Sequence, residues 1–363
     1  MEKKKICYLL PFFDTATDSH HFHLYDFINE AGKELDILLI IEKGSSDTSF
    51  FTNVSAVYEQ KFSFLPLRVM ENFLLIALAR MKGYRKFYVH YSYVSAINSS
   101  VICKLSAAKN WYWSCGMMWL FKKDILNQFL IKSTLHFVDY LVTGVDVLAA
   151  GYSKNYGIPL EKIRIMPNWI DLGRFDRVYE TDKLKDKYGI PRNKKIILFI
   201  HRLAARKGAH FIIPISKLLE KSYHFLVVGD GPLKEDIGNA VQNDHLENIQ
   251  LLGKISNARI PEIMALADVF FMPSEEEGFP RVLIECMASG LPYVASNVGG
   301  VEEISPETQK KFIYASGDVQ AFADGIQEII RNGKGFYEKD LQKKAREYDQ
   351  KNVIGIFIGL FQK

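Results

Sequence analysis

The chain has 363 residues, 48% of them hydrophobic and 24% charged, which is enough for two domains of ordinary size with a core in each. Its net charge is only +4, with acidic and basic residues interspersed, which argues against a nucleic-acid-binding protein, because such proteins usually carry a stronger basic surface. No run of about 18 apolar residues occurs, so no transmembrane helix is expected.

The start of the chain and the cysteines indicate a cytoplasmic protein. After three lysines at 3–5, a short apolar run is interrupted by Asp14 and Asp18, which is typical of a first strand and not of a signal peptide. The cysteines are scattered and form no C-x-x-C pair, which suits a reducing compartment better than a disulfide framework. They are Cys7, Cys103, Cys115 and Cys286.

The first half alternates short buried runs with longer helical stretches. Strands are expected at 6–10, 35–41, 86–90, 110–113, 140–143 and 163–166. Helices are expected at 20–31, 67–81, 94–108 and 121–137. Strands that alternate with helices indicate a parallel sheet covered on both faces.

The second half repeats this alternation more clearly. Strands are expected at 195–200, 224–228, 248–252, 269–272, 293–295 and 312–314. Helices are expected at 209–221, 232–242, 260–267, 281–289 and 319–331, the second of them with Pro232 at its first position. The sequence therefore predicts a second parallel sheet of the same class.

Polarity suggests how these halves are divided. The charged segment 171–195 is the expected linker between two Rossmann-like domains. The apolar tail 348–362 is expected to form a terminal helix, a candidate to dock across both domains. The predicted divisions are a first domain at 1–172, a second at 173–345 and a terminal segment at 346–363.

Two carboxylates, Glu277 and Glu285, lie eight residues apart across a strand-to-helix turn. Both are expected to face the crevice at the carboxyl end of the sheet, where open α/β sheets bind ligands. The free N–H groups of a helix start can bind phosphate there. Carboxylates for sugar and ribose hydroxyls beside amides for a diphosphate make a nucleotide-sugar site. The alternative, a plain acidic loop, is favoured for Glu275 and Glu276 but not for Glu277.

Several short motifs occur in a fixed order through the second half and its approach. They are Pro167 to Asp171, His201 to Leu203, Arg206 to Gly208, Val227 to Pro232, Ala267 and Asp268, Pro273 and Ser274, Glu277 to Glu285, Gly290 to Pro292, and Gly299 to Ile304. In order and spacing they resemble the retaining, GT-B fold glycosyltransferases of glycosyltransferase family 4 (group 1). The resemblance implies two Rossmann-like domains facing a central cleft, with the C-terminal helix crossing back to the N-terminal domain.

The resemblance also implies roles for four side chains. Arg202 and Lys207 would bind the donor diphosphate and stabilise the charge that grows on the leaving group. Glu285 would accept hydrogen bonds from the ribose hydroxyls, and Glu277 would contact the transferred sugar. The alternative for the basic pair is two solvated cations, but a helix start disfavours cations, so a bound anion is the better explanation.

Further residues would surround the nucleotide. Four of them form the loop whose backbone N–H groups are candidates to contact the diphosphate: Gly278, Phe279, Pro280 and Arg281. Pro280 cannot donate a backbone hydrogen bond, so the N–H groups of its neighbours would do so. Whether the Arg281 side chain reaches the diphosphate or lies on the surface stays open. Lys254 and Ile255 would line the nucleobase, largely through their backbone.

The first half departs from the resembled family at two places. A Gly-Gly pair is usual where this chain has Thr17 to His21, and a His-Gly pair is usual where it has Cys115 and Gly116. Both departures concern contacts with the transferred sugar. No Asp-x-Asp occurs anywhere, so no essential metal is expected, and the expected small molecule is the nucleotide-sugar donor itself, with a UDP-sugar favoured over a GDP-sugar.

Three apolar or aromatic stretches are candidates to lie on an anionic membrane surface. Residues 111–113 and 117–123 mix aromatics with lysines, and 73–79 is apolar between basic residues. The alternative is that they are core elements of the first domain. Core burial is favoured for 111–113, and the question stays open for 117–123.

Together these features predict a cytoplasmic, retaining, metal-independent glycosyltransferase, with the inner membrane face as a candidate docking surface. It would move a sugar from a nucleotide-diphosphate donor to a hydroxyl of a glycan or lipid-linked glycan, in surface polysaccharide or glycoconjugate synthesis. Two alternatives remain: a nucleotide-sugar epimerase, for which the first half shows no carboxylates suited to proton abstraction, and a non-catalytic partner that binds a nucleotide-sugar.

Overall fold

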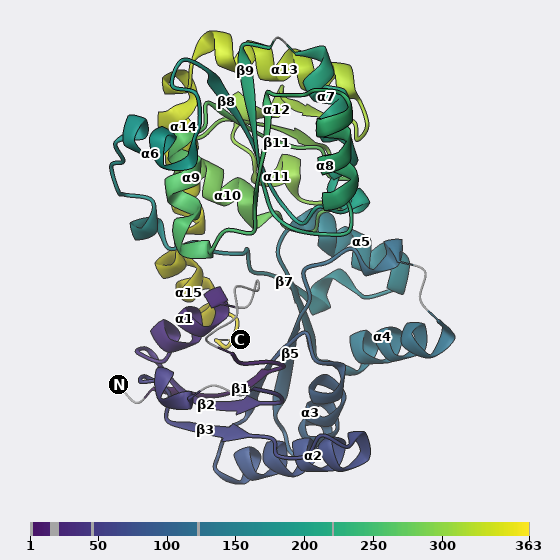
Figure 1. The fold of residues 1–363 in the computed structure, drawn as a ribbon. Helices are drawn as coiled ribbons and strands as arrows, with labels where there is room; N and C mark the ends of the chain where they lie inside the picture. Colours follow the sequence, from purple (N-terminus) through teal and green to yellow (C-terminus); the bar gives the residue numbers. More distant parts are fainter. Residues whose placement is uncertain (1–2, 15–21, 45–46, 122–123, 220, 363) are drawn as a thin grey trace. The chain divides into compact units, whose positions relative to one another are not determined.

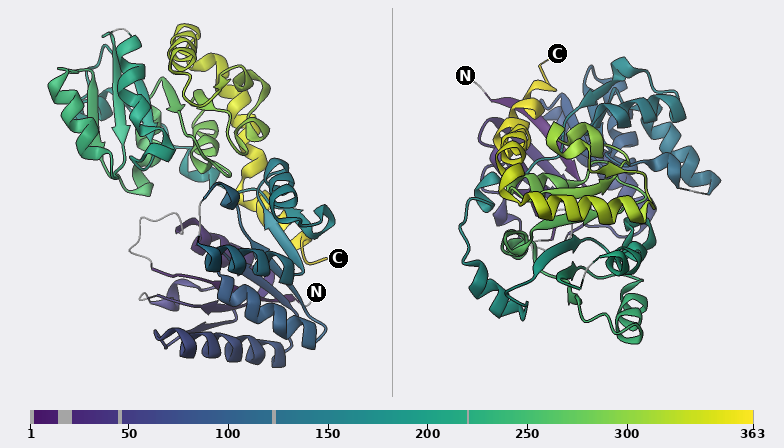
Figure 2. Two further views of the ribbon diagram at one scale, coloured as in Figure 1. Left: turned by 90° about the vertical axis from the view of Figure 1, so that its right-hand side faces the viewer. Right: turned by 90° about the horizontal axis from the view of Figure 1, so that it is seen from above.

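The computed structural model describes residues 3–14, 22–44, 47–121, 124–219 and 221–362 (Figure 1). The chain forms two compact units. Unit 1 comprises Met1–Pro167 and Val353–Lys363, and unit 2 comprises Asn168–Asn352. The sequence had suggested divisions after 172 and 345 instead. Each unit is built on one parallel sheet, and Figure 2 shows these sheets with their helices from two further sides.

The sheet of unit 1 has seven strands in the order β3-β2-β1-β4-β5-β6-β7, and every neighbouring pair is parallel. The chain first moves outward from β1 to β3 and then returns to lay β4 on the other side of β1. The strands are β1 Lys4–Leu10, β2 Leu35–Ile41, β3 Ala56–Glu59, β4 Lys86–His90, β5 Lys109–Trp113, β6 Tyr140–Thr143 and β7 Ile163–Ile165.

Right-handed crossovers divide the helices of unit 1 between the two sheet faces. The outward and the returning connections run in opposite directions, so α1 lies on one face and α2 to α5 on the other. The terminal helix α15 joins α1. The helices are α1 Phe22–Ala31, α2 Leu65–Met81, α3 Tyr93–Leu105, α4 Ile125–Phe137, α5 Asp146–Tyr156 and α15 Gln350–Gly359.

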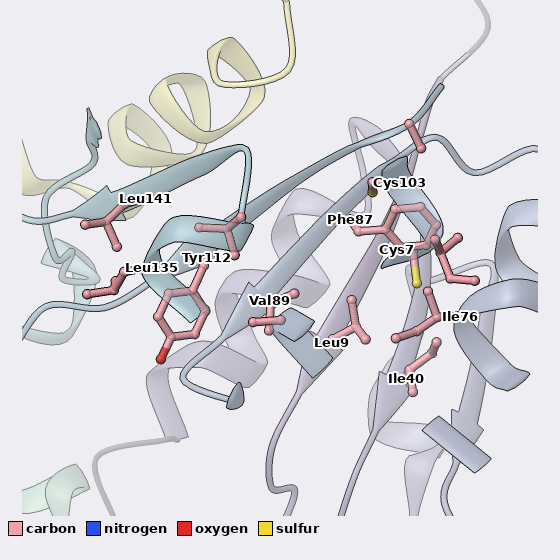
Figure 3. Packing of buried hydrophobic residues seen from close by; sticks show 14 of the residues in the cluster. Cys7, Leu9, Ile40, Ile76, Phe87, Val89, Cys103, Tyr112, Leu135 and Leu141 are labelled. Atoms are coloured by element: carbon pink, nitrogen blue, oxygen red, sulfur yellow. The ribbon is translucent and has the colours of Figure 1, made fainter. Parts of the chain in front are cut away.

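Strand side chains of unit 1 alternate between two packed layers. Cys7 and Leu9 of β1 point into the cluster that α2 to α5 cover, together with Phe87 and Val89 of β4 (Figure 3). Tyr8 points the other way, where its ring lies 6.2 Å from that of Phe357 in α15.

The face of the sheet beneath α15 is aromatic. Besides Tyr8, the ring of Phe357 meets Phe27 of α1 at 5.3 Å and Tyr88 of β4 at 4.8 Å, between ring centroids. The Nζ of Lys86 donates to the carbonyl of Phe361 at 2.6 Å, which ties down the end of the chain. These contacts explain why the last residues belong to unit 1.

The sheet of unit 2 has six strands in the order β10-β9-β8-β11-β12-β13, again all parallel. Its chain also starts in the middle, moves outward to β10, and returns to lay β11 beside β8. The strands are β8 Lys195–Ile200, β9 Tyr223–Val228, β10 Ile249–Gly253, β11 Val269–Met272, β12 Tyr293–Ser296 and β13 Ile313–Tyr314.

The helices of unit 2 cover both faces of its sheet. In Figure 1, α9, α10 and α14 lie to the left of the sheet, and α7 and α8 to its right. They are α6 Thr181–Tyr188, α7 Ile212–Leu218, α8 Lys234–Asn243, α9 Ile260–Leu266, α10 Arg281–Ala288, α11 Val301–Ile304, α12 Glu307–Lys310, α13 Val319–Asn332 and α14 Gly335–Ala345. Single 3-10 turns are η1 Thr48–Phe50, η2 Met118–Leu120, η3 Leu160–Lys162, η4 Leu172–Arg174, η5 Ala205–Lys207, η6 Ala209–Phe211, η7 Asn257–Arg259 and η8 Arg346–Tyr348.

The structure corrects several expected elements. The expected linker 171–195 contains the helix α6, which ends at Gly189 in the left-handed conformation. The helix expected from Pro232 begins at Lys234, because Gly231 to Leu233 form a turn first. The helix expected from 121 begins at Ile125, because Asp124 caps it by accepting the Asn127 N–H at 2.8 Å.

The predictions about burial can also be compared with the structure. Burial of 111–113 in the core is confirmed, since all three side chains are inaccessible. Within 117–121 the side chains differ in exposure. Trp119 packs on Tyr152, whereas Phe121 is exposed. All four cysteines are free and buried. In the part of the chain that the structure describes, no helix has the length and apolar character needed to cross a membrane.

Candidate functional site

The candidate site of unit 2 lies where the winding of its sheet reverses. β8 and β11 are neighbours, but their crossovers leave in opposite directions, and open α/β sheets bind ligands beyond the carboxyl ends of the strands at such a switch point. His201 follows β8 directly, and the loop of Ser274 and Glu277 follows β11. Topology alone therefore brings these two loops together.

Two glycines allow the loops to approach backbone to backbone. Gly208 has φ +70°, and a Cβ there would lie 2.0 Å from the carbonyl oxygen of Pro273. Gly299 has φ +54°, and its Cβ would lie 1.7 Å from the carbonyl oxygen of Glu277. Only glycine fits both the dihedral angle and the space at these positions. They fix the loop after β11 against its neighbours on both sides.

The carboxylate of Glu277 is the centre of this arrangement. Its Oε1 accepts hydrogen bonds from the Lys207 Nζ at 2.7 Å, the His201 Nε2 at 3.0 Å and the Ser274 Oγ at 3.0 Å. Lys207 and Glu277 are both almost fully buried. No described residue donates to Oε2, so this oxygen remains able to accept a hydrogen bond from a ligand.

The hydrogen bonds of His201 define its tautomer. Its Nδ1 accepts the backbone N–H of Arg202 at 2.8 Å, so Nδ1 carries no proton. The proton of the neutral ring therefore sits on Nε2, which donates to Glu277. His201 thus presents its Nε2 as a donor to the carboxylate, and Lys207 adds a positive charge.

These donors keep Glu277 ionised. Burial alone would raise the pKa of its carboxyl, but the hydrogen bond from His201 and the charge and hydrogen bond of Lys207 outweigh burial and hold the pKa at about 2. A fixed anion therefore faces the crevice at every physiological pH. Lys207, which was expected to bind a diphosphate, uses two of its hydrogens on Glu277 and on the carbonyl of Glu276 at 3.0 Å.

Glu285 lies farther along the chain, in the middle of α10, and is half-buried. Burial raises the pKa of its carboxyl above the usual range, although the guanidinium groups of Arg281 and Arg174 act to lower it. Burial likewise lowers the pKa of Arg281 to about 10, which leaves it charged at neutral pH. Arg174, in η4, also donates to the carbonyl of Asn257 at 2.5 Å. Glu285 thus belongs to a second charged group, with two cations.

The remaining predicted positions lie at the same edge of the sheet. Arg202 is exposed, and its guanidinium makes no hydrogen bond or ion pair with the residues that the structure describes. Lys254 and Ile255 follow β10, with Lys254 exposed. Arg202 is therefore a cation available to a ligand in a way that Lys207 is not.

The loop between Glu277 and α10 is held in place by hydrogen bonds that its backbone carbonyls accept. The Gly278 carbonyl accepts the N–H of Gly300 at 2.9 Å, and the Phe279 carbonyl accepts the Asn168 side chain at 3.2 Å. Phe279 is buried and stacks edge-on against Tyr348 at 5.6 Å. Pro280 directly precedes α10 and is its N-cap. The contact of this loop with a diphosphate stays a prediction.

Sequence reasoning gave no role to three residues of this site. His201 and Ser274 lay in motifs, but nothing indicated that both would donate to Glu277. The position of His201 directly after a buried strand was the available signal. Arg174 lay in the expected linker, where no pattern distinguished it from other charged residues.

The two departures noted in the first half differ in what the structure describes. Residues 17–21 lie outside the described residues. Cys115 follows β5 and is buried, which raises the pKa of its thiol to about 12 and leaves it unreactive at neutral pH. Across the described residues, no three His, Cys, Asp or Glu side chains gather as a metal site would need. The expectation of metal independence stays a prediction.

The sequence of unit 2 matches a known protein family. Residues 180–351, nearly all of unit 2, match the family described as Glycosyl transferases group 1. This part of the chain is similar to the group 1 glycosyl transferases.

Two named relatives are similar to part of the chain. The N-acetyl-alpha-D-glucosaminyl L-malate synthase of Bacillus anthracis is 29% identical over 261 residues, which cover 64% of this chain and 66% of the relative. The UDP-Gal:alpha-D-GlcNAc-diphosphoundecaprenol alpha-1,3-galactosyltransferase of Escherichia coli is 29% identical over 176 residues, covering 46% of this chain and 45% of the relative. The matches thus span less than two thirds of these relatives.

Similarity in fold extends over the whole chain. The Anabaena protein Alr3699/HepE, solved in complex with UDP, superimposes with a TM-score of 0.80 at 17% identity and covers 98% of this chain and 99% of that protein. Two parallel, Rossmann-like sheets of seven and six strands are therefore a GT-B fold, as predicted.

Proposed function

We propose that the protein is a retaining glycosyltransferase that moves a sugar from a UDP-sugar to a hydroxyl of a glycan or lipid-linked glycan. The observation that carries the proposal is the carboxylate of Glu277. One of its oxygens is held by Lys207, His201 and Ser274, and the other is left to a ligand, at the switch point of a nucleotide-binding type of sheet.

The choice of donor and acceptor draws on relatives. The Anabaena protein was solved with UDP-glucose, and the Escherichia coli relative is named for UDP-galactose and a diphosphoundecaprenol-linked acceptor. Four buried, free cysteines favour a cytoplasmic location, where disulfides are rare. We place the enzyme there, in surface polysaccharide or glycoconjugate synthesis.

In the proposed reaction the residues of unit 2 bind and orient the donor. Oε2 of Glu277 accepts a hydrogen bond from a hydroxyl of the transferred sugar, and Glu285 accepts hydrogen bonds from the ribose hydroxyls. Arg202 binds the diphosphate and stabilises the charge that develops as the bond from the anomeric carbon to the phosphate oxygen breaks. The acceptor oxygen bonds to the same face of that carbon while its proton passes to the leaving phosphate, giving the glycoside and UDP. No protein base is needed, and the anomeric configuration is retained.

Donor hydrolysis tests this function without knowledge of the acceptor. UDP-glucose is incubated with the protein, and the release of UDP and free glucose is measured with and without a chelator. Glu285→Ala and Arg202→Ala are each expected to lower the rate by about a hundredfold or more, because each removes an interaction with charge or hydroxyls that water does not replace.

A matched control is Lys217→Ala, which removes an exposed lysine of α7 whose Nζ pairs with Asp244 at 2.7 Å. This variant should turn over at the wild-type rate. Full activity in Glu285→Ala or Arg202→Ala would refute the proposed site. Binding of UDP-glucose in a thermal-shift assay with no release of UDP would instead support the non-catalytic alternative. Loss of activity with the chelator would refute metal independence.

A further inference from the structure

The outer surface of the α2, α3 and α4 layer in unit 1 is unusual for a surface. These helices cover one sheet face, and their inner sides supply Ile76, Cys103 and Leu135 to the core (Figure 3). Direct contacts join them, since the Asn72 Nδ2 of α2 donates to Ser95 of α3 at 2.9 Å. Their outer sides therefore form one continuous face, and polar residues are expected there.

Large apolar side chains stand on this face instead. Ile125 is 87% exposed, Phe129 66%, Leu105 79% and Met81 77%. We call these four residues, with Leu74 and Leu126, the outer apolar face. Single exposed apolar residues are ordinary, but a set spread over three adjoining helices marks an interaction surface.

Helical spacing shows that this exposure is built into the sequence. In α4, Ile131 and Leu135 are buried, whereas Ile125 and Phe129 lie on the opposite side, with Lys132 three residues beyond Phe129. The outer apolar residues of α4 contribute nothing to the core, as is expected of residues that contact a partner.

The charge of this region identifies the kind of partner. Residues 61–137 contain eleven lysines and arginines but two acidic residues, a net charge of +9, so the rest of the chain carries −5 against the total of +4. The overall composition had suggested that basic and acidic residues are evenly interspersed. This local excess of basic residues shows that they are not. Glu71 accepts the N–H groups of Lys61 and Phe62, and Asp124 caps α4. Neither α3 nor α4 carries an acidic side chain.

Two of these cations lie among the apolar residues. Lys104 of α3 places its Nζ 4.2 Å from the ring centroid of the half-exposed Phe137 in α4, and Lys132 is exposed on the outer side of α4. An anionic bilayer matches this combination, because apolar side chains enter the interface while lysines bind lipid phosphates. A second copy of the chain would place two cationic faces against each other.

We propose that the outer apolar face docks unit 1 on an anionic lipid bilayer. The α2, α3 and α4 helices lie along the membrane surface with Ile125, Phe129 and Leu105 in its interfacial layer. This inference goes beyond the proposed sugar transfer and does not depend on it, since every residue that carries it belongs to unit 1.

Vesicle co-sedimentation of the full chain tests the proposal. Vesicles of equal parts phosphatidylglycerol and phosphatidylcholine should bind the wild-type protein, and vesicles of phosphatidylcholine alone should bind it far more weakly. The double variant Ile125→Glu with Phe129→Glu should lower the partition coefficient by about a hundredfold, at about tenfold for each apolar side chain withdrawn from the interface. The matched control is Phe336→Glu, which changes a 69% exposed phenylalanine of α14 in unit 2 and should bind as wild type.

A second variant separates charge from apolar contact. Lys104→Gln with Lys132→Gln should weaken binding to the anionic vesicles by about thirtyfold, since each lysine near the surface contributes about 1 kcal/mol, while leaving the weak binding to phosphatidylcholine unchanged. Circular dichroism and thermal unfolding, compared with wild type, show that each variant is folded.

Several outcomes would overturn the proposal. They are absence of binding to both vesicle types, equal binding to both, or an equal loss in Phe336→Glu. A dimer that Phe129→Glu dissociates, in a protein that binds no vesicles, would assign the face to a second copy. Vesicle binding by a protein that neither binds nor hydrolyses UDP-glucose would leave this inference standing and refute only the proposed function.

Discussion

Replacing Lys207 by methionine should destabilise unit 2 in a pH-dependent way. Lys207 and Glu277 form a buried pair with a 2.7 Å hydrogen bond, and methionine keeps the apolar stem of lysine while removing the charge. The pKa of Glu277 is lowered from 4.5 to about 2, which corresponds to about 3 kcal/mol in favour of the ionised form. Part of this comes from His201, so we expect Lys207→Met to lose about 2 to 3 kcal/mol near pH 7.

The sign of the pH dependence follows from the direction of the pKa change. A carboxyl with a lowered pKa stabilises the folded state above its ordinary pKa, and this stabilisation is lost as the pH falls through the folded value. In Lys207→Met, burial acts with less opposition and raises the pKa of Glu277. The difference in unfolding free energy between wild type and variant should therefore be largest near pH 7 and should shrink as the pH falls from about 5 toward about 2.

Urea unfolding followed by circular dichroism measures this difference, and hydrogen exchange in β8 and β11 assigns the affected transition to unit 2. The double variant Lys207→Met with Glu277→Gln should be more stable than Lys207→Met alone, because the amide oxygen still accepts from His201 and Ser274 without leaving a buried charge. A difference that does not change with pH, or a double variant no more stable than the single one, would refute this account of Glu277.

Two further predictions concern packing. Gly299→Ala should lower the free energy of unfolding by at least about 2 kcal/mol and abolish the UDP thermal shift, because its Cβ would overlap the Glu277 carbonyl oxygen at 1.7 Å. Gly189→Ala, which is also at positive φ (+65°) but has open space around it, should cost about 1 kcal/mol and keep the shift. Equal losses of the two variants in urea unfolding would contradict this. Phe357→Ala should destabilise unit 1 by about 3 to 5 kcal/mol, because it empties the aromatic contacts beneath α15, while the neighbouring, partly exposed Ile356→Ala should cost less than about 1 kcal/mol; comparable losses in the two variants would show that α15 is not anchored by this ring.

The central strands were predictable from the sequence because they are buried on both faces. β4, β8 and β11 have the predicted bounds, and each is a nearly continuous apolar run, as parallel central strands require. β3 was missed because it lies at the edge of its sheet, has four residues and is only half-buried. Edge strands lack the continuous apolar run by which central strands are recognised.

Helices with a polar majority were harder to predict. α14 was missed although Tyr337, Leu341 and Ala345 recur at every fourth position and are buried. Its sequence is otherwise charged and begins with glycine, so the apolar stripe was the only available signal. α5 was missed for a similar reason, since Leu148, Ala149 and Tyr152 are separated by small and polar residues.

The positions of the site residues were predictable, but their contacts were not. Strand ends indicate which loops share an edge, and the family resemblance assigned roles to Glu277 and Arg202 within those loops. The sequence does not specify that Lys207 would turn inward to Glu277, because this depends on the close approach of backbones at Gly208 and Gly299. Which oxygen of a carboxylate is occupied is decided only in three dimensions.

The assignment of residues 353–363 to unit 1 has a consequence for biosynthesis. A ribosome releases the N-terminal segment first, yet the aromatic surface of Tyr8, Tyr88 and Trp111 cannot be covered until the final residues of the chain have emerged. Throughout translation of the second unit, nascent chains would expose an uncovered, aggregation-prone aromatic surface. A premature stop codon near the 3′ end of the message would therefore damage the portion that was synthesised earliest.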